Sequence, residues 1–171
     1  MGYISLKNLN LELLEQEEDA AIVLEVIEEM DFGFSKKAIR AVYPSPKMII
    51  GRITNNLEIA SIAKVSDKVV GFATVFLTPY EKTLASLYLC GVKEEFRRKE
   101  IGKSALNLVL DKCEKIGVRK VTCMVPSENV DGLVFLIKCG FKPSAYLSDA
   151  YSLKKDGILM FRYLQDGETK T

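Results

Sequence analysis

The chain has 171 residues, of which 48% are hydrophobic, enough for one folded domain with a single core. Its 24 basic and 23 acidic residues give a net charge of +1, which excludes a strong global attraction to nucleic acid or to an anionic membrane. The apolar stretches are shorter than the roughly 20 residues that span a bilayer, and the N-terminus becomes acidic where a secretory signal would be apolar.

The N-terminal part of the chain shows helical spacing. Apolar residues recur among acidic ones from residue 12 to residue 30, which predicts an amphipathic helix. A short strand is expected before this helix, near residues 3–6. A second, shorter helix is expected after it and would end before Pro44.

The middle of the chain changes to the period of two that is typical of strands. Residues 58–65 and 69–77 flank a turn at 66–68, which predicts an antiparallel hairpin. A third strand is expected at 84–92, after the break at Pro79.

The second half of the chain alternates helices and strands. An apolar stripe that begins at Ile101 predicts a helix that Gly117 can end. A strand is expected at 120–125, followed by a helix that starts near Asn129 and stops at Gly140. The apolar face predicted for that helix consists of Val130, Leu133, Val134 and Ile137. The chain then continues with a strand at 141–147, a polar loop at 148–157 and a strand at 158–164.

This order of elements predicts a mixed α/β fold. We expect a central twisted mixed sheet of about six to seven strands, flanked by about four helices. No linker is long enough to divide the chain, so residues 1–171 are predicted to form one domain, located in the cytoplasm. Dimerisation through the C-terminal strands or the N-terminal helices is compatible with the sequence.

The chain contains no histidine and four widely spaced cysteines. Without histidine, a Ser-His or Cys-His nucleophile and a histidine general base are excluded. The cysteines lie inside apolar patterns with no Cys-x-x-Cys spacing, so we expect reduced thiols and no metal site. They are Cys90, Cys113, Cys123 and Cys139.

The stretch from Glu94 to Leu110 has the features of an anion site. Three basic residues, Arg97 to Lys99, precede a helix start, where free N–H groups and the helix dipole favour a phosphate. Gly102 would allow a ligand to approach the backbone closely. A charged, solvated helix start explains the same residues equally well.

The segment from Cys90 to Leu106 resembles the acetyl-CoA-binding motif of the GNAT superfamily of N-acetyltransferases. In that motif Gln or Arg is followed by two residues, Gly, one residue, and then Gly or Ala. Arg97 and Gly102 match the pattern, whereas Glu100 stands where the family has Gly. The resemblance therefore implies a GNAT fold in which the carboxylate weakens cofactor binding without abolishing it.

A second segment carries the same resemblance further along the chain. Asn129, Phe135 and the run Cys139-Gly140-Phe141 resemble the family's helix that begins with Asn and ends in Gly-Phe. The two motifs occur in the family's order.

The resemblance implies a set of contacts with acetyl-CoA. Cys90 and Val92 would face the pantetheine arm, while Asn129 and Phe135 would approach the cofactor from the next helix. The main-chain amides that would hold the pyrophosphate belong to Arg97, Arg98, Lys99, Glu100, Ile101, Gly102, Lys103 and Ser104.

The catalytic groups are less completely matched. The family's tyrosine acid falls on Leu136 here, so that role is empty or filled from elsewhere. With regular strand alternation Tyr88 shares a face with Cys90, which would aim its phenol at the cleft; a packing role is the alternative. The backbone N–H of Val92 is the predicted donor to the developing oxyanion. Further candidates for acceptor contacts, each with a packing or solvated role as the alternative, are Tyr146, Tyr151, Glu81, Glu28 and Glu29.

Three functions are compatible with these residues. The first is an acetyl-CoA-dependent N-acetyltransferase that acts on a primary amine of a small molecule or a peptide. The second is a GNAT-fold module that binds CoA or an acyl-CoA without turnover. The third, a nucleotide-binding protein of another α/β class, lacks a complete Walker or Rossmann glycine pattern. The identity of the amine acceptor cannot be read from the sequence.

Overall fold

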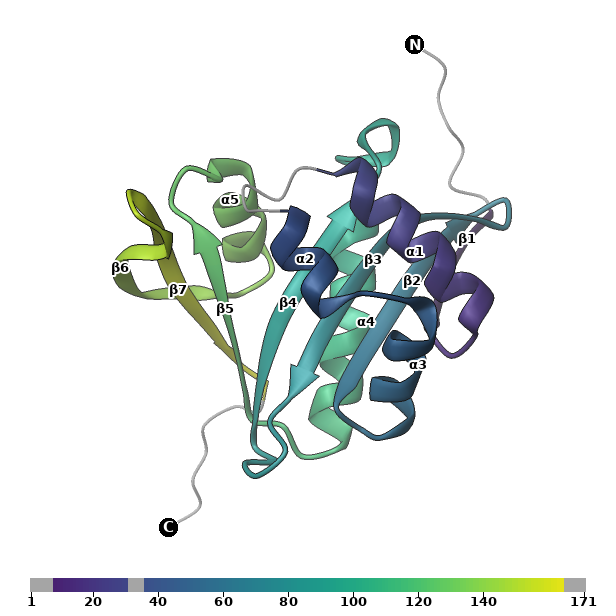
Figure 1. The fold of residues 1–171 in the computed structure, drawn as a ribbon, viewed down its shortest axis with the longest axis horizontal. Coiled ribbons are helices and arrows are strands. Elements are labelled where there is room, and N and C mark those ends of the chain that lie inside the picture. The colour runs from purple at the N-terminus through teal and green to yellow at the C-terminus, as the bar shows by residue number, and fades with distance from the viewer. Residues whose placement is uncertain (1–7, 31–35, 165–171) are drawn as a thin grey trace.

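The computed structural model describes residues 8–30 and 36–164, and over these ranges it contains a seven-stranded sheet and five α-helices (Figure 1). The strands are β1 Leu9–Leu13, β2 Glu58–Val65, β3 Lys68–Leu77, β4 Leu84–Val92, β5 Lys120–Pro126, β6 Lys142–Ser152 and β7 Lys155–Tyr163. The helices are α1 Glu17–Glu29, α2 Lys36–Val42, α3 Pro46–Thr54, α4 Ile101–Lys115 and α5 Val130–Lys138. Across this described part, no helix is both long and apolar enough to cross a membrane.

The sheet has the order β1-β2-β3-β4-β5-β7-β6. Neighbouring strands are antiparallel except β4 and β5, which are parallel. The predicted mixed α/β fold and its strand number are confirmed. The predicted hairpin and the strand at 84–92 are confirmed as β2, β3 and β4.

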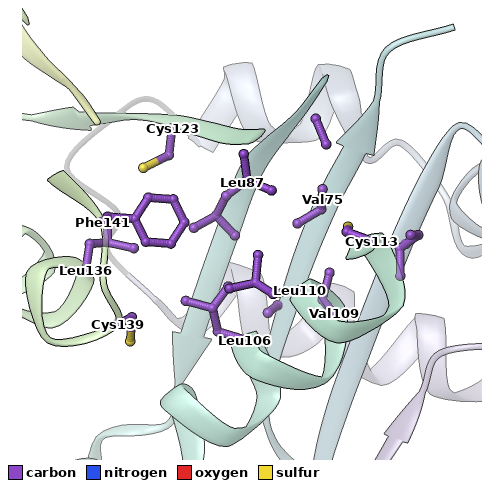
Figure 2. Close-up of a cluster of buried hydrophobic side chains, with 14 of the residues drawn as sticks. Val75, Leu87, Leu106, Val109, Leu110, Cys113, Cys123, Leu136, Cys139 and Phe141 are labelled. Atoms are coloured by element: carbon purple, nitrogen blue, oxygen red, sulfur yellow. The ribbon is translucent and has the colours of Figure 1, made fainter. Parts of the chain in front are cut away.

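Helices cover both faces of the sheet. Helices α1 to α3 lie over β2, β3 and β4 on one face, and α4 lies behind the same strands on the other (Figure 1). On the α4 face, Leu106 and Leu110 pack against Leu87, and Phe141 inserts its ring from the position between α5 and β6 (Figure 2). This buried cluster ties the β5-β7-β6 half of the sheet to the rest of the molecule.

Two N-terminal predictions need correction. The helix predicted at 12–30 is present as α1, but it begins at Glu17, and Glu12 and Leu13 belong to β1, because Leu9 to Leu13 alternates with a period of two and pairs with β2. Helix α3 was not predicted, although Ser45 caps it by accepting from the N–H of Met48 and Pro46 follows as its first residue. The strand expected near residues 3–6 lies outside the described residues.

Two C-terminal predictions also need correction. The segment predicted as a loop at 148–157 belongs largely to β6 and β7, which are joined at Leu153 and Lys154. On α5, Leu136 is buried, whereas three residues of the predicted apolar face are exposed, because the helix packs on α4 and the sheet through a different stripe. The exposed residues are Val130, Val134 and Ile137.

Candidate functional site

Strands β4 and β5 diverge after three paired residues. The last pair joins Ser86 to Thr122, whose hydroxyl oxygens lie 3.3 Å apart. Beyond it the two strands no longer pair, and they separate towards the N-terminus of α4 (Figure 1). The edge of β4 from Leu87 to Val92 therefore has no strand partner on its β5 side among the described residues.

The free edge of β4 carries two residues of the predicted cofactor site. The N–H of Lys93 donates to Val70 on β3 at 2.8 Å, so strand alternation turns the N–H groups of Cys90 and Val92 away from β3. The Val92 carbonyl accepts from Arg97 Nε at 3.0 Å. Burial raises the pKa of the Cys90 thiol to about 12, so this group stays a thiol at neutral pH and offers no nucleophile.

Strand β4 has a bulge at Tyr88. Its neighbours Leu87 and Leu89 pair with consecutive residues of β3, so Tyr88 is an extra residue. Leu87 and Cys90 consequently pack on the α4 face, whereas Tyr88 packs on the face of α1 to α3. The prediction that Tyr88 shares a face with Cys90 was wrong, because the bulge interrupts the alternation on which it depended.

The N-terminus of α4 presents a row of backbone donors. The N–H of Ser104 donates to the Glu100 carbonyl at 2.9 Å and closes the first turn. The N–H groups from Arg98 to Lys103 have no acceptor in the part of the chain that the structure describes. Arg98 and Glu100 hold left-handed backbone, with φ of 59° and 61°. This explains why glycine suits the position of Glu100.

Two of the three basic side chains that precede α4 are bonded to the protein backbone. Arg97 bonds to Val92, and Lys99 Nζ donates to the Glu95 carbonyl at 3.0 Å, so both side chains brace the turn. The carboxylate of Glu100 points outward and lies 3.3 Å from Lys103 Nζ. An outward-pointing carboxylate with a lysine partner is compatible with the expectation that Glu100 weakens cofactor binding without abolishing it.

Gly102 keeps the start of α4 close to its neighbours. A Cβ atom on Gly102 would lie 3.1 Å from Val92 Cγ2 and 3.5 Å from the Phe135 ring. The structure thus brings together Val92, Gly102 and Phe135 from three separate elements. The Asn129 side chain accepts from the N–H of Gly132 at 2.9 Å and caps α5, a role that the sequence analysis did not assign.

The remaining candidates are already engaged. Glu28 forms an ion pair with Arg40 on α2, and Glu29 pairs with Lys93. The hydroxyls of the two C-terminal tyrosines also have partners: that of Tyr151 donates to the Met124 carbonyl, and that of Tyr146 donates to Asp156. Glu81 accepts from Thr83, and Leu136 is buried in the core.

A buried polar network lies under Tyr88 and was missed by sequence reasoning. Glu58 is 1% exposed and accepts from Arg52 Nε at 2.8 Å. The Tyr43 hydroxyl lies 2.8 Å from Glu58 Oε1 and 2.9 Å from Thr74 Oγ1. Burial raises the pKa of both Glu58 and Tyr43. The available signal was the glutamate at the start of a largely apolar strand.

Comparison with known proteins agrees with this geometry. Residues 24–141, more than half of the chain, match the family described as the acetyltransferase (GNAT) family. Comparison with curated proteins by sequence gave no significant match.

Many solved structures share the fold. A GNAT-family protein from Desulfovibrio desulfuricans has a TM-score of 0.82 at 18% identity, covering 92% of this chain and 99% of that one. The ribosomal-protein-S18-alanine N-acetyltransferase of Escherichia coli has a TM-score of 0.73 at 18% identity, with 95% and 99% covered. The PaiA N-acetyltransferase of Thermoplasma acidophilum, in complex with coenzyme A, has a TM-score of 0.71 at 23% identity, with 90% and 99% covered. The chain therefore belongs to the acetyltransferase (GNAT) family.

Proposed function

We propose that the protein is a cytoplasmic acetyl-CoA-dependent N-acetyltransferase that acts on a primary amine of a small molecule or of a peptide or protein, with residues 1–171 forming one domain. One observation carries the proposal: the N–H groups at the start of α4, which have no acceptor among the described residues, lie next to the unpaired edge of β4 at Val92. This pair of features suits a long ligand with a pyrophosphate at one end and amide groups along its arm.

The residues present fit acetyl-CoA. The N–H groups of residues 98–103 would hold the pyrophosphate, because they have no acceptor within residues 8–30 and 36–164 and the helix dipole is positive there. Cys90 and Val92 would pair with the pantetheine arm through the backbone. Phe135 would line the path between α4 and α5, since its ring already lies against Gly102.

The chemistry requires groups that manage charge and protons. When bound, acetyl-CoA supplies an acetyl group activated as a thioester. The Val92 N–H is the proposed donor to negative charge on the acetyl oxygen. The Tyr88 hydroxyl is the proposed proton donor to the leaving sulfur, because Tyr88 lies on the stretch of β4 that is unpaired on its β5 side. Burial raises the pKa of this phenol above the ordinary 10.0, so it remains protonated at neutral pH.

Two solved structures with the same fold support this function, one by its activity and the other by its bound ligand. The Escherichia coli neighbour acetylates an alanine amine of a ribosomal protein, and the Thermoplasma acidophilum neighbour was solved with coenzyme A. A second candidate function, binding of CoA or an acyl-CoA without turnover, is favoured by the buried Leu136 at the family's tyrosine position and by Glu100 in the binding turn.

Calorimetric titration with acetyl-CoA, followed by a panel of small amines and peptide N-termini, tests the proposal. We expect binding in the micromolar range and acetylation of at least one class of amine. Binding without transfer across the panel would favour the second candidate function. An absence of binding at millimolar acetyl-CoA would contradict both.

Replacing Glu100 with glycine should tighten acetyl-CoA binding about fivefold, because two like charges near 4 Å in water repel by roughly 1 kcal/mol. The substitution should also stabilise the fold by roughly 1 kcal/mol, since glycine adopts the left-handed conformation without strain. Titration calorimetry measures the first effect and thermal unfolding the second.

Arg98→Gly is the matched control for this change. Arg98 shares the turn and the positive φ of Glu100 but carries the opposite charge. We expect the same gain in thermal stability together with weaker acetyl-CoA binding. If the two variants changed the affinity in the same direction, repulsion by the Glu100 carboxylate would be the wrong explanation.

A further inference from the structure

The bulge in β4 is held by a side chain from the neighbouring strand. Thr74 on β3 is 2% exposed, and its Oγ1 accepts from the N–H of Leu89 at 3.3 Å. The same hydroxyl lies 3.5 Å from the Leu89 carbonyl. Because the extra residue Tyr88 immediately precedes Leu89, this hydroxyl fixes the backbone on the C-terminal side of the bulge.

Thr74 is the last member of a network of polar side chains. The members come from β2, β3, α3 and the residue that follows α2. Tyr43, which follows α2, links Thr74 to Glu58 on β2, and Glu58 accepts from Arg52 on α3. Arg52 Nη1 also donates to the Val42 carbonyl at 2.8 Å, which ties the end of α2 to α3. The α2–α3 region is thereby connected to the bulge through directional bonds.

The same residues support the ring of Tyr88. Its centroid lies 5.1 Å from that of Phe76 and 5.6 Å from that of Tyr43. The Arg52 guanidinium contacts the same two rings, 4.9 Å from the Tyr43 centroid and 5.4 Å from that of Phe76. The direction of the Tyr88 side chain therefore depends on the network both through the backbone and through ring packing.

Stability alone does not account for this arrangement. A buried ion pair often contributes no more than apolar side chains of the same volume, because both charges lose their hydration. Arg52 Nη2 is also buried without a hydrogen-bond partner in the described residues, which adds a further cost. A fixed geometry at the bulge is a reason to retain such a network.

We propose that Thr74, Tyr43, Glu58 and Arg52 are positioning residues for acyl transfer, which fix the β4 bulge and thereby the direction of Tyr88 and of the free N–H groups that follow it. The inference rests on the proposed function for its catalytic consequence, whereas its structural half can be tested without any substrate. None of the four residues is assigned to contact acetyl-CoA.

Thr74→Val tests the inference, because valine keeps the shape of threonine and removes the hydroxyl. We expect amide hydrogen exchange at Leu89, followed by NMR, to become about tenfold faster or more. We expect kcat with the best amine of the panel to fall by about tenfold, and the calorimetric Kd for acetyl-CoA to rise by clearly less than this, since the α4 turn that would hold the pyrophosphate is untouched. Thr74→Ser should restore both values.

Ser61→Ala is the matched control. Ser61 on β2 is fully buried, and its hydroxyl donates to the Ala105 carbonyl of α4 at 2.7 Å, so the variant loses a buried hydroxyl bond away from the bulge. We expect a similar loss of thermal stability with kcat and Leu89 exchange unchanged. If both variants showed the same kcat and the same Leu89 exchange, the inference would be overturned. If the wild type acetylated no amine, the proposed function would fail, and Leu89 exchange would still decide whether Thr74 fixes the bulge.

Discussion

Replacing Gly102 with valine is expected to weaken acetyl-CoA binding by about 100-fold or more, which corresponds to roughly 3 kcal/mol. The first added carbon would already lie 3.1 Å from Val92 Cγ2, closer than most carbon contacts in folded proteins. A branched side chain must therefore displace Val92 or Phe135, or turn towards the row of N–H groups that would hold the pyrophosphate. Titration calorimetry with acetyl-CoA measures the loss.

Gly51→Val is the matched control for this variant. Gly51 also lies inside a helix, α3, but a Cβ atom there would meet no atom within 4 Å. We expect this variant to keep the acetyl-CoA affinity and to be slightly more stable, because valine has a better helix propensity than glycine. Gly102→Ala serves as a milder variant if Gly102→Val does not fold. Unchanged affinity in both Gly102 variants would show that the ligand does not approach this part of α4.

The elements that were predicted correctly from the sequence are those in which apolar residues recur with one clear spacing. The β2-β3 hairpin and α4 have turn residues or a glycine at their ends and a single apolar stripe, and their bounds match the predictions within a few residues. The position of the phosphate turn follows from the same signals, since it joins a clear strand to a clear helix. The half of the site made by α4 was therefore predictable.

Two elements were predicted with a wrong face or wrong bounds, and in both the sequence pattern is ambiguous. On α5, Val134 and Ile137 compete with Leu133 and Leu136 for the inward face, because nearly the whole helix is apolar. Which stripe is buried depends on how the helix docks on α4, and that is a tertiary property. At the C-terminus, the polar composition of 148–157 conceals strand pairing, since β6 is largely exposed to solvent.

The catalytic half of the site could not be predicted for a different reason. The bulge at Tyr88 adds one residue to β4 and reverses every face that follows it, yet a bulge of this kind has no reliable signature in a single sequence. The network beneath it joins residues that are 15 to 31 positions apart in the chain. Only the fold brings Tyr43, Glu58 and Thr74 together.

Replacing Tyr88 with phenylalanine is expected to lower kcat by about 100-fold, the scale of a general acid, with acetyl-CoA affinity nearly unchanged. The ring would keep its contacts with Phe76 and Tyr43, and no described residue bonds to the Tyr88 hydroxyl, so thermal stability should be preserved. Steady-state kinetics with the best amine of the panel, together with thermal unfolding, measure these values.

Tyr151→Phe provides the comparison that assigns the acid. The Tyr151 hydroxyl donates to the Met124 carbonyl at 2.7 Å, so its loss should cost roughly 1 kcal/mol of stability and leave kcat largely intact. The pH dependence gives a second criterion. Burial raises the pKa of Tyr88 above 10.0, and an acid is competent while protonated, so the kcat deficit of Tyr88→Phe should be equal at about pH 7 and about pH 9. A deficit confined to Tyr151→Phe would transfer the acid role to Tyr151, and a deficit in neither variant would leave protonation of the leaving sulfur to water.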